Sequence, residues 1–535
     1  MIHGRERRDA GSLNVVRSFP ASHGGIMTTI RTTILGSAAA LMAIGGAQAA
    51  DLPLKAKAVE YVKVCSLYGA GFYYIPGTDT CIKIGGAIRI DTTINGGPYD
   101  APYWQGGAGG NDLWTKDNYL TRDRINLTTD TRTSTEYGTV RAYANFQLDF
   151  TQNRDSIAGG FTEVDLVFIQ FAGFTFGKAV SQFDPQWALT KPYISSGFLA
   201  GSNNTTGLPQ IAYTAEFGNG VSASIALENA SPYRNAGLYN TANFIVAPGA
   251  GQFGNQLYGV SSYTFLGNSY GGNHIPDIVG NVRLDQKWGS LHFGAAMHTI
   301  TPGFYGANES TGHPDDSYGF AVTGAVEFKN LPTGSGDSLK IETSYGKGAT
   351  KYVFGGGTLD TQGGGRFAKF EGNTVGFGYL LDGVFGTNGQ IQQAETWQVS
   401  AFYEHYWNTA WRTSLFGNYS RISYGDGGNA LLATAFSPAG GRLGTSSATS
   451  PTGTNAGSIS GTTSNFDFAI AQIGTRTAWT PVKNLTLSAE FTYTRLDQNL
   501  GGTYTGNVTG RPAGVTYDIR DQNLYNGSVQ ILRSF

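Results

Sequence analysis

Charge, methionine and cysteine are all scarce in this 535-residue sequence, which has 14% charged residues, 4 Met and 2 Cys. Long apolar runs are scarce as well. Beyond the first 49 residues, no run reaches the roughly 18 uninterrupted apolar residues of a membrane helix, so the sequence predicts no transmembrane helix there. The formal net charge of -2 lacks the basic excess that is typical of nucleic-acid-binding proteins.

Recognisable catalytic motifs are missing too. No nucleophile elbow or phosphate loop stands out, and the run Gly-Gly-Gly-Arg at residues 363–366 lacks the strand–helix context of such a loop. His292 and His298 lie six residues apart on one strand face and could in principle bind a metal. We interpret them as ordinary interior residues, and we expect no cofactor, no metal site and no enzymatic activity.

Glycine and aromatic residues are abundant instead, with 77 Gly, 31 Phe, 29 Tyr and 8 Trp. This composition favours many strands and turns. The mean hydropathy of -0.20 is typical of a soluble protein. A membrane barrel gives a similar value, because every second strand residue faces water and the average hides the two faces. The composition therefore indicates one large β-structure.

Segments of about ten residues with alternating polarity recur roughly sixteen times from Cys81 onward. The first, residues 81–91, sets four Ile on one face against Lys83, Arg89 and Asp91 on the other. The last, residues 525–535, ends the chain on Phe535. An unpaired terminal strand would leave an open edge, so we expect it to pair with the first strand and close a barrel.

Short and long connections alternate along the chain. Seven are short: residues 132–137, 172–173, 218–220, 288–290, 330–337, 408–410 and 481–484. Eight are long: residues 97–117, 151–160, 179–208, 229–276, 301–316, 347–394, 425–464 and 497–520. These counts predict an all-β, sixteen-stranded, antiparallel up-and-down transmembrane barrel.

Two further features refine this prediction. Tryptophans lie beside the short turns, as in an aromatic girdle at the membrane interface: Trp288, Trp407, Trp411 and Trp479. Alternation is poor in residues 163–171 and 466–472, where we expect bulges or parity errors.

The N-terminal 49 residues read as an export signal. A basic start at residues 27–31, an apolar stretch and Ala47-Gln48-Ala49 describe a secretory signal peptide over residues 27–49. Residues 1–26 are interpreted as a non-native extension, with a disordered cytoplasmic extension as the alternative. We expect residues 50–80 to form a periplasmic segment and residues 81–535 the barrel.

The two cysteines lie just beyond this signal and enclose 15 residues. In an exported protein, Cys65 and Cys81 are expected to form a disulfide. A metal site on two Cys is disfavoured, because no His lies between residues 24 and 273 to complete it.

Two motifs resemble a known family. Residues 59–65 (VEYVKVC) and 68–86 (YGAGFYYIPGTDTCIKIGG) resemble the start of mature outer-membrane porins of alphaproteobacteria, the family of the Brucella and rhizobial porins. Residues 168–181 (FIQFAGFTFGKAVS) and the terminal Phe535 add to the resemblance. It implies a homotrimer in the outer membrane of a Gram-negative bacterium, surrounded by lipid and lipopolysaccharide, that passes small hydrophilic solutes and ions.

The resemblance also implies that the third long loop, residues 179–208, folds into the lumen. Basic side chains share the polar face of the first strands: Arg89, Arg122, Arg124 and Arg141. In the family such a basic wall faces the third loop, which here offers Asp184 as an opposite charge that would bias ion entry. The alternative is that the arginines pair with Asp91, Asp130 and Asp149 on their own wall.

Two other functions compete with a diffusion porin. One is a loop-displaying outer-membrane barrel, an adhesin or surface receptor with a narrow or occluded lumen. The other is a soluble secreted β-protein.

Overall fold

The computed structural model describes residues 63–96, 114, 118–151, 161–194, 197–199, 201–202, 206–229, 231, 234–241, 269–306, 308–355, 366–436, 458–506, 512 and 514–535. The expected N-terminal extension (1–26) and signal peptide (27–49) lie outside these residues. The chain divides into two compact units, residues 1–61 and 62–535, and only the second contains described residues. Among them, no helix combines the length and apolar character that crossing a membrane requires.

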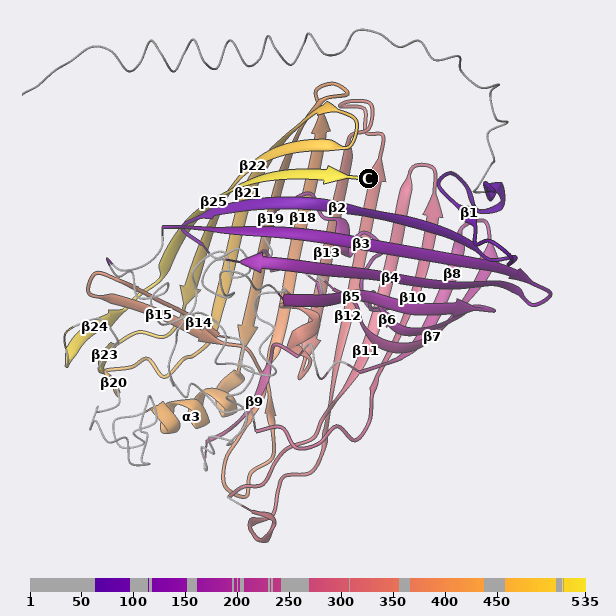
Figure 1. The fold of residues 1–535 in the computed structure, drawn as a ribbon. Coiled ribbons are helices and arrows are strands. Elements are labelled where there is room, and N and C mark those ends of the chain that lie inside the picture. Colours follow the sequence, from indigo (N-terminus) through magenta and orange to yellow (C-terminus); the bar gives the residue numbers. More distant parts are fainter. Residues whose placement is uncertain are drawn as a thin grey trace, which may run out of the picture. The chain divides into compact units, whose positions relative to one another are not determined.

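Sixteen strands of the described residues form one closed antiparallel sheet (Figure 1). In chain order they are β2 (Cys81–Ile94), β3 (Tyr119–Thr135), β4 (Gly138–Thr151), β5 (Phe161–Phe171), β6 (Phe174–Ala179), β7 (Leu208–Gly218), β8 (Val221–Glu228), β10 (Asp277–Gln286), β11 (Gly289–Ile300), β12 (Ser317–Lys329), β13 (Ser338–Lys347), β18 (Glu395–Tyr406), β19 (Trp411–Ser423), β21 (Phe468–Val482), β22 (Leu485–Gln498) and β25 (Gln522–Ser534). A two-residue strand, β1 (Tyr73–Tyr74), pairs with the start of β2.

The first and last strands close the barrel. The pairing of β2 with β25 runs from Ala87 opposite Ser534 to Ile94 opposite Gly527. Each of the remaining barrel strands pairs with the barrel strand before it and the one after it in the chain, so none of the sixteen is left as an edge strand. The predicted sixteen-stranded barrel and its closure by the terminal strand are both confirmed.

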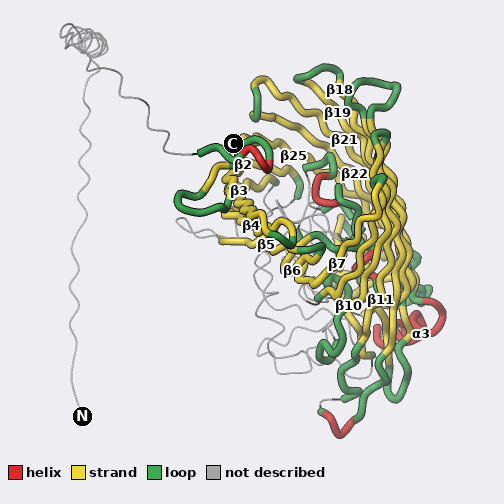
Figure 2. Tube along the Cα trace, turned by 90° about the vertical axis from the view of Figure 1, so that its right-hand side faces the viewer, coloured by secondary structure: helices red, strands yellow, loops and turns green. Residues whose placement is uncertain are grey.

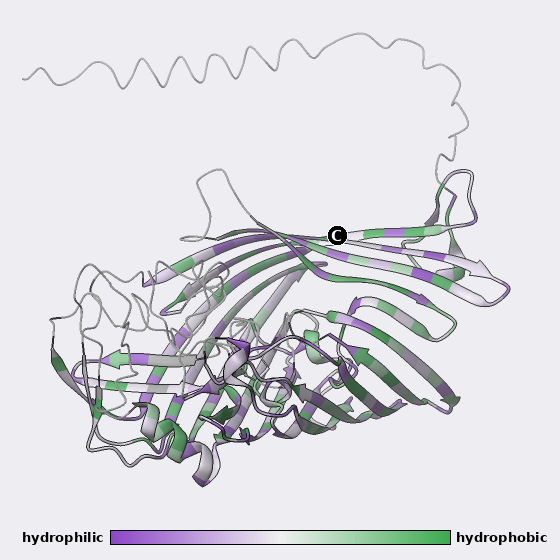
Figure 3. Cartoon of the chain, turned by 90° about the horizontal axis from the view of Figure 1, so that it is seen from below, coloured by the Kyte–Doolittle hydropathy of each residue, from purple (hydrophilic) through white to green (hydrophobic). Residues whose placement is uncertain are grey.

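The alternation read from the sequence separates the two faces of the wall. Ile84, Ile88 and Ile90 of β2 are exposed on the outer face, whereas Asp91 is buried on the inner face. The same change of polarity from residue to residue is visible along the strands in Figure 3. An apolar outer face and a polar inner face are what a barrel in lipid requires.

One of the two irregular stretches contains the expected bulge. The register between β4 and β5 shifts between Asn145 and Phe146, within the span that pairs with residues 163–171. In β21 the register instead shifts between Trp479 and Val482. The alternation is poor at Phe468–Ile470 because all three residues are buried, which removes the contrast between faces.

The predicted tryptophans lie at the end of the barrel that has the short turns. Trp288, Trp407, Trp411 and Trp479 are exposed beside these turns, and Trp411 stacks on Trp479 with ring centroids 5.6 Å apart. At the same end, the predicted disulfide joins Cys65 to Cys81 at the start of β2. Tyr68 and Phe72 pack against the two buried cysteines and cover this bond.

The long loops contain their own secondary structure (Figure 2). One small sheet contains β14 (Arg366–Glu371), β15 (Thr374–Tyr379), β20 (Ser458–Ser460), β23 (Thr503–Gly506) and β24 (Val515–Ile519); another contains β9 (Gly237–Asn240), β16 (Leu381–Phe385) and β17 (Gln392–Gln393). The loops also hold the helix α3 (Gly425–Phe436) and the short 3-10 helices η2 (Ala188–Thr190), η4 (Glu309–Thr311) and η5 (Thr350–Tyr352); η1 (Ser66–Tyr68) lies at the other end, inside the disulfide loop.

These loops share a hydrophobic core. Buried side chains from five long loops and the adjoining strand ends form one cluster, including Leu199, Tyr239, Phe370, Leu432 and Tyr517. Parallel pairings of β16 with β9 and of β15 with β24 join loops that are distant in sequence. We call this assembly of β9, β14–β17, β20, β23, β24 and α3 the loop cap.

Candidate pore

Four arginines lie on the inner face of three adjacent strands. Arg89 is on β2, Arg122 and Arg124 are on β3, and Arg141 is on β4. The register places Arg89 directly opposite Arg124 and Asp91 directly opposite Arg122, so these residues share one face of the sheet. We call this group the arginine wall.

Each of these arginines has an aspartate partner on the same wall. Arg89 and Arg122 bind Asp91 with N···O distances of 2.7 and 2.6 Å. Arg124 binds Asp149 at 2.6 Å, and Arg141 binds Asp130 at 3.0 Å. The local pairing that the sequence left open is therefore present. Two further charges join these pairs: Arg132 also binds Asp130 at 2.8 Å, and Glu163 lies 3.7 Å from Arg124. Five arginines and four carboxylates then leave one positive charge in excess within this set.

The third long loop makes polar contacts with inner-face residues of several strands. Lys191 binds Glu342 of β13 at 2.7 Å, and Ser414 of β19 donates to Pro192 O at 2.8 Å. Gln472 of β21 accepts from Leu199 N at 2.8 Å and donates to Gly197 O at 3.0 Å. These contacts hold the loop against the inner wall.

Aromatic packing adds to this anchoring. Trp187, Tyr193 and Phe198 of the loop cluster with the buried rings of Phe402 on β18 and Phe416 on β19. The loop also reaches the arginine wall, since Arg89 Nη2 donates to Ile194 O at 3.1 Å. The loop thus spans from the arginine wall to the strands of the second half of the chain.

Asp184 lies in this loop and is only 5% exposed. Its Oδ1 accepts a hydrogen bond from Ser202 N at 2.9 Å. Burial raises the pKa of Asp184 to about 6, and the bond from Ser202 and the charge of Lys191 only partly offset this effect. Its other charged neighbours are Glu342 and Lys351, so its nearest basic partners come from loops rather than from the arginine wall.

A cavity of about 1040 Å³ lies inside the barrel between this loop and the short turns. Arg141, Gln170, Gln182, Asp184 and Arg283 are among the residues that line it. Its polar lining and its size suit water and small hydrophilic solutes.

The two candidate histidines have protein partners. His292 Nε2 lies 2.9 Å from Phe183 O in the third loop, and His298 Nδ1 lies 2.8 Å from Asp277 Oδ1. In the part of the chain that the structure describes, no group of three or more His, Cys, Asp or Glu side chains is placed to hold a metal ion. His292 thus fixes the third loop to β11, and His298 joins β11 to the start of β10.

The sequence reading missed the network around His298. Tyr270 donates to Asp382 Oδ2 at 2.7 Å and lies 3.2 Å from His298 Nε2, while Tyr352 donates to Asp277 Oδ2 at 2.6 Å. Burial raises the pKa values of both tyrosines well above their ordinary value, so both phenols keep their protons. The one available signal was Asp382, a lone acid in the otherwise uncharged run 374–394.

Comparison with known proteins agrees with this architecture. The sequence profile of the porin subfamily matches residues 51–527. Porin Omp2b of Brucella canis is 28% identical over 355 residues, which are 60% of this chain and 86% of that porin. Porin Omp2b of Brucella neotomae is 30% identical over 274 residues, which are 49% of this chain and 64% of that porin.

The fold agrees with a solved structure as well. The outer membrane channel DcaP of Acinetobacter baumannii superimposes with a TM-score of 0.53 at 15% identity, over 86% of this chain and 99% of that one. This likeness shows the same fold. Together with the closed barrel, its apolar outer face and the profile match over residues 51–527, the comparisons establish that this chain belongs to the porin subfamily and forms a channel in the outer membrane of a Gram-negative bacterium.

Proposed function

We propose that the arginine wall and the third loop together set which ions and small hydrophilic solutes pass through this porin. The observation that carries the proposal is the bond from Arg89 to Ile194 O, which brings the loop against the basic wall. An excess positive charge beside a narrowed aqueous path attracts anions and repels cations. We therefore expect weak anion selectivity.

A planar-bilayer recording tests this function directly. Purified protein should insert in discrete conductance steps, and a KCl gradient should give a zero-current potential of the sign that anion preference requires. Cation preference would contradict the role of the arginine wall, and protein that inserts without conducting would contradict an open channel.

A second candidate follows from the loop cap. Its buried core includes Phe354, Phe370 and Tyr517, so the long loops pack against one another through a common hydrophobic core. Such a surface suits an adhesin or receptor barrel with a narrow or occluded lumen. If the cap closes the pore, conductance should appear only after external protease treatment of reconstituted protein.

Assembly and processing are part of the proposal. The porin forms a homotrimer embedded in outer-membrane lipid and lipopolysaccharide, which the apolar outer face of the barrel supports. Native mass spectrometry of the extracted protein should give three copies. The signal peptide at residues 27–49 is removed, so N-terminal sequencing of the mature protein should begin at Ala50.

A further inference from the structure

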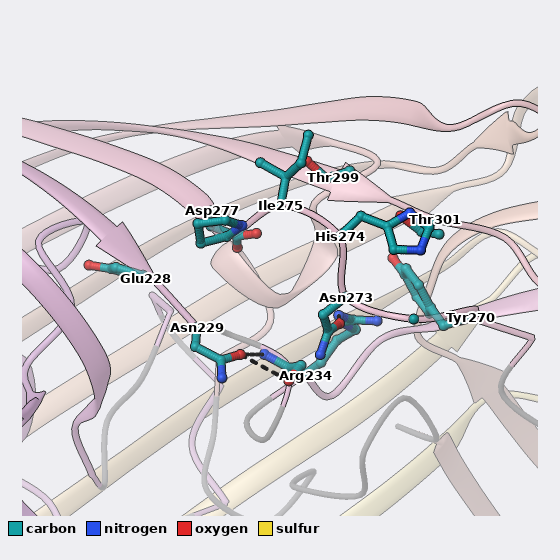
Figure 4. A pocket seen from close by; sticks show the side chains of 13 residues that line it. Glu228, Asn229, Arg234, Tyr270, Asn273, His274, Ile275, Asp277, Thr299 and Thr301 are labelled. Carbon is teal, nitrogen blue, oxygen red and sulfur yellow. Dashed lines mark hydrogen bonds between the residues drawn. The ribbon is translucent and has the colours of Figure 1, made fainter.

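A separate cavity of about 250 Å³ lies where β8, β10 and β11 run into the long loops (Figure 4). Most of the side chains around it are polar, and they come from the end of β8, from residues 229, 231 and 234 after it, from the segment 270–277 and from the end of β11. Figure 4 shows Arg234 and Asn273 near one another, with Tyr270 and His274 to one side and Asp277 and Glu228 to the other.

Arg234 is the unusual member of this lining. It is 7% exposed, and its guanidinium lies over the ring of Tyr270, 3.8 Å from the centroid. Nη2 donates to Asn273 Oδ1 at 3.1 Å, whereas the buried Nε has no hydrogen-bond partner among the described residues. No described carboxylate forms an ion pair with it.

A buried guanidinium without a counter-ion is costly, because its lost hydration is not repaid. Stacking on Tyr270 fixes the plane of the Arg234 fork, a geometry that suits two parallel hydrogen bonds to a carboxylate. Thr299 Oγ1, which is buried in the same lining, also lacks a partner among the residues that the structure describes. The cavity thus offers unused donors to an anionic group.

Two carboxyl groups in the lining are already held by protein donors. Glu228 accepts from Gln182 N at 2.7 Å and from Ser181 Oγ at 2.8 Å. Asp277 accepts from His298 Nδ1 and from the Tyr352 hydroxyl. Glu228 is 0% exposed, so only its protein donors reach it, whereas Asp277 is 4% exposed and its oxygens can still accept from a ligand. The carboxylate of Asp277 opposes a second negative charge in the cavity and favours an ammonium group.

We propose that this cavity binds a small α-amino acid, with the ligand carboxylate on Arg234 and its ammonium facing Asp277. The volume equals roughly eight water molecules at about 30 Å³ each, which is enough for a short side chain. The inference deepens the proposed function, on which it rests, by placing a solute-binding step at the loop end of the channel.

Isothermal titration of the full-length protein, extracted from membranes as its native oligomer, with L-alanine tests the proposal. We expect saturable binding that Arg234→Gln weakens at least tenfold, since a charge-assisted bidentate pair is lost. Arg234→Lys keeps the charge but not the fork and should weaken binding less than Arg234→Gln. The control is Arg520→Gln, because Arg520 is an exposed loop arginine whose ion pair with Asp518 lies in another loop; this variant should bind normally.

Propionate and isopropylamine each lack one of the two charges, and both should bind at least fivefold more weakly than L-alanine. Equal binding of propionate would show a simple anion site and overturn the proposal. So would the absence of saturable L-alanine binding, or binding that both Arg234 variants leave unchanged. Conductance in KCl is recorded on the same samples. A conducting protein that does not bind L-alanine refutes this inference alone, whereas a non-conducting one refutes the proposed function.

Discussion

Gly86 and Phe535 exchange two backbone hydrogen bonds, Gly86 N to Phe535 O at 3.2 Å and Phe535 N to Gly86 O at 3.0 Å. A Cβ atom added at Gly86 would lie 2.3 Å from Asn126 O and 2.8 Å from Cζ of Phe535. Asn126 O and the terminal ring together therefore occupy the space that a side chain at residue 86 would need. This contact extends the β2–β25 pairing to the last residue of the chain.

Gly86→Ala should therefore weaken closure of the barrel, by about 1–3 kcal/mol as for other overpacked sites. The measurement is the fraction of heat-modifiable trimer as a function of urea concentration. Gly324→Ala is the matched control, since a Cβ there meets nothing within 4 Å. Equal effects of the two substitutions would show that the fit of Phe535 against residue 86 does not matter for closure.

The turn between β12 and β13 is held by one buried carboxylate. Asp337 accepts hydrogen bonds from Thr333 Oγ1 at 2.6 Å, His405 Nδ1 at 2.7 Å and Tyr406 N at 2.8 Å. Loss of hydration acts to raise the pKa of Asp337, but these hydrogen bonds outweigh it and lower the pKa to about 2.

A carboxyl group whose pKa is lower in the folded state than in the unfolded state stabilises the fold at pH values above its unfolded-state pKa. This stabilisation is lost as the pH falls through its folded-state pKa. Asp337→Asn should thus cost about 1.5–3 kcal/mol at neutral pH, as for hydrogen bonds to a charged group. The difference from wild type should shrink between about pH 4 and pH 2. Thermal melts across this range check it, with the exposed Asp79→Asn as control. A difference that does not depend on pH would contradict this account.

The disulfide between Cys65 and Cys81 restrains the segment that precedes β2. Peptide mapping without reduction should recover the two cysteines linked. Replacing both by Ser should make residues 63–80 sensitive to protease, because a loop of about 15 residues loses a restraint of roughly 3 kcal/mol in the chain-entropy model. Two free thiols in protein taken directly from the envelope would refute the link.

The loop cap should be separable from the barrel. Phe370 and Tyr517 pack edge to face at 5.1 Å within the cap core, and Tyr517 is almost fully buried. Tyr517→Ala should cost about 3–5 kcal/mol locally and expose the long loops to trypsin. The heat-modifiable barrel should persist, because its strand pairing does not use this ring. Loss of the barrel together with the cap would show that the two fold as one unit.

The strands were predictable because their signal is local. In β2, the fourteen residues themselves show the alternation of apolar and polar side chains at a period of two. The number of strands then follows from the number of short and long connections between them. The cap core was not predictable in this way. Tyr239, Phe370 and Tyr517 lie in three Gly-rich loops, and the sequence of each loop does not indicate which of the other loops it packs against.

The arginine wall and the cavity around Arg234 could be predicted from the sequence only in part, for a related reason. Polar parity predicts that Arg122 lies on the inner face, but its pairing with Asp91 depends on the β2–β3 register, which one strand alone does not define. Arg234 is exceptional because no carboxylate of the described residues forms an ion pair with it, a property that no local pattern contains.

The arginine wall offers the last test, through the pair of Arg124 and Asp149. The two side chains lie 2.6 Å apart on the inner face. They therefore affect the electrostatic potential in the same region of the lumen, with opposite sign. Arg124→Gln should move the zero-current potential in a KCl gradient toward cation selectivity, and Asp149→Asn should move it toward anion selectivity. Both shifts should be larger at 0.1 M than at 1 M salt, since the Debye length falls from about 10 to about 3 Å.

Asp123→Asn is the matched control for this pair. Asp123 lies on the same strand, one residue from Arg124, but it is exposed on the outer face of the barrel. It should therefore leave the potential unchanged. Heat-modifiable trimer is measured for all three variants, because neutralising one partner of a buried pair leaves the other charge uncompensated. If the assembled Arg124 and Asp149 variants both keep the wild-type potential, the arginine wall lies outside the conduction path and does not set selectivity.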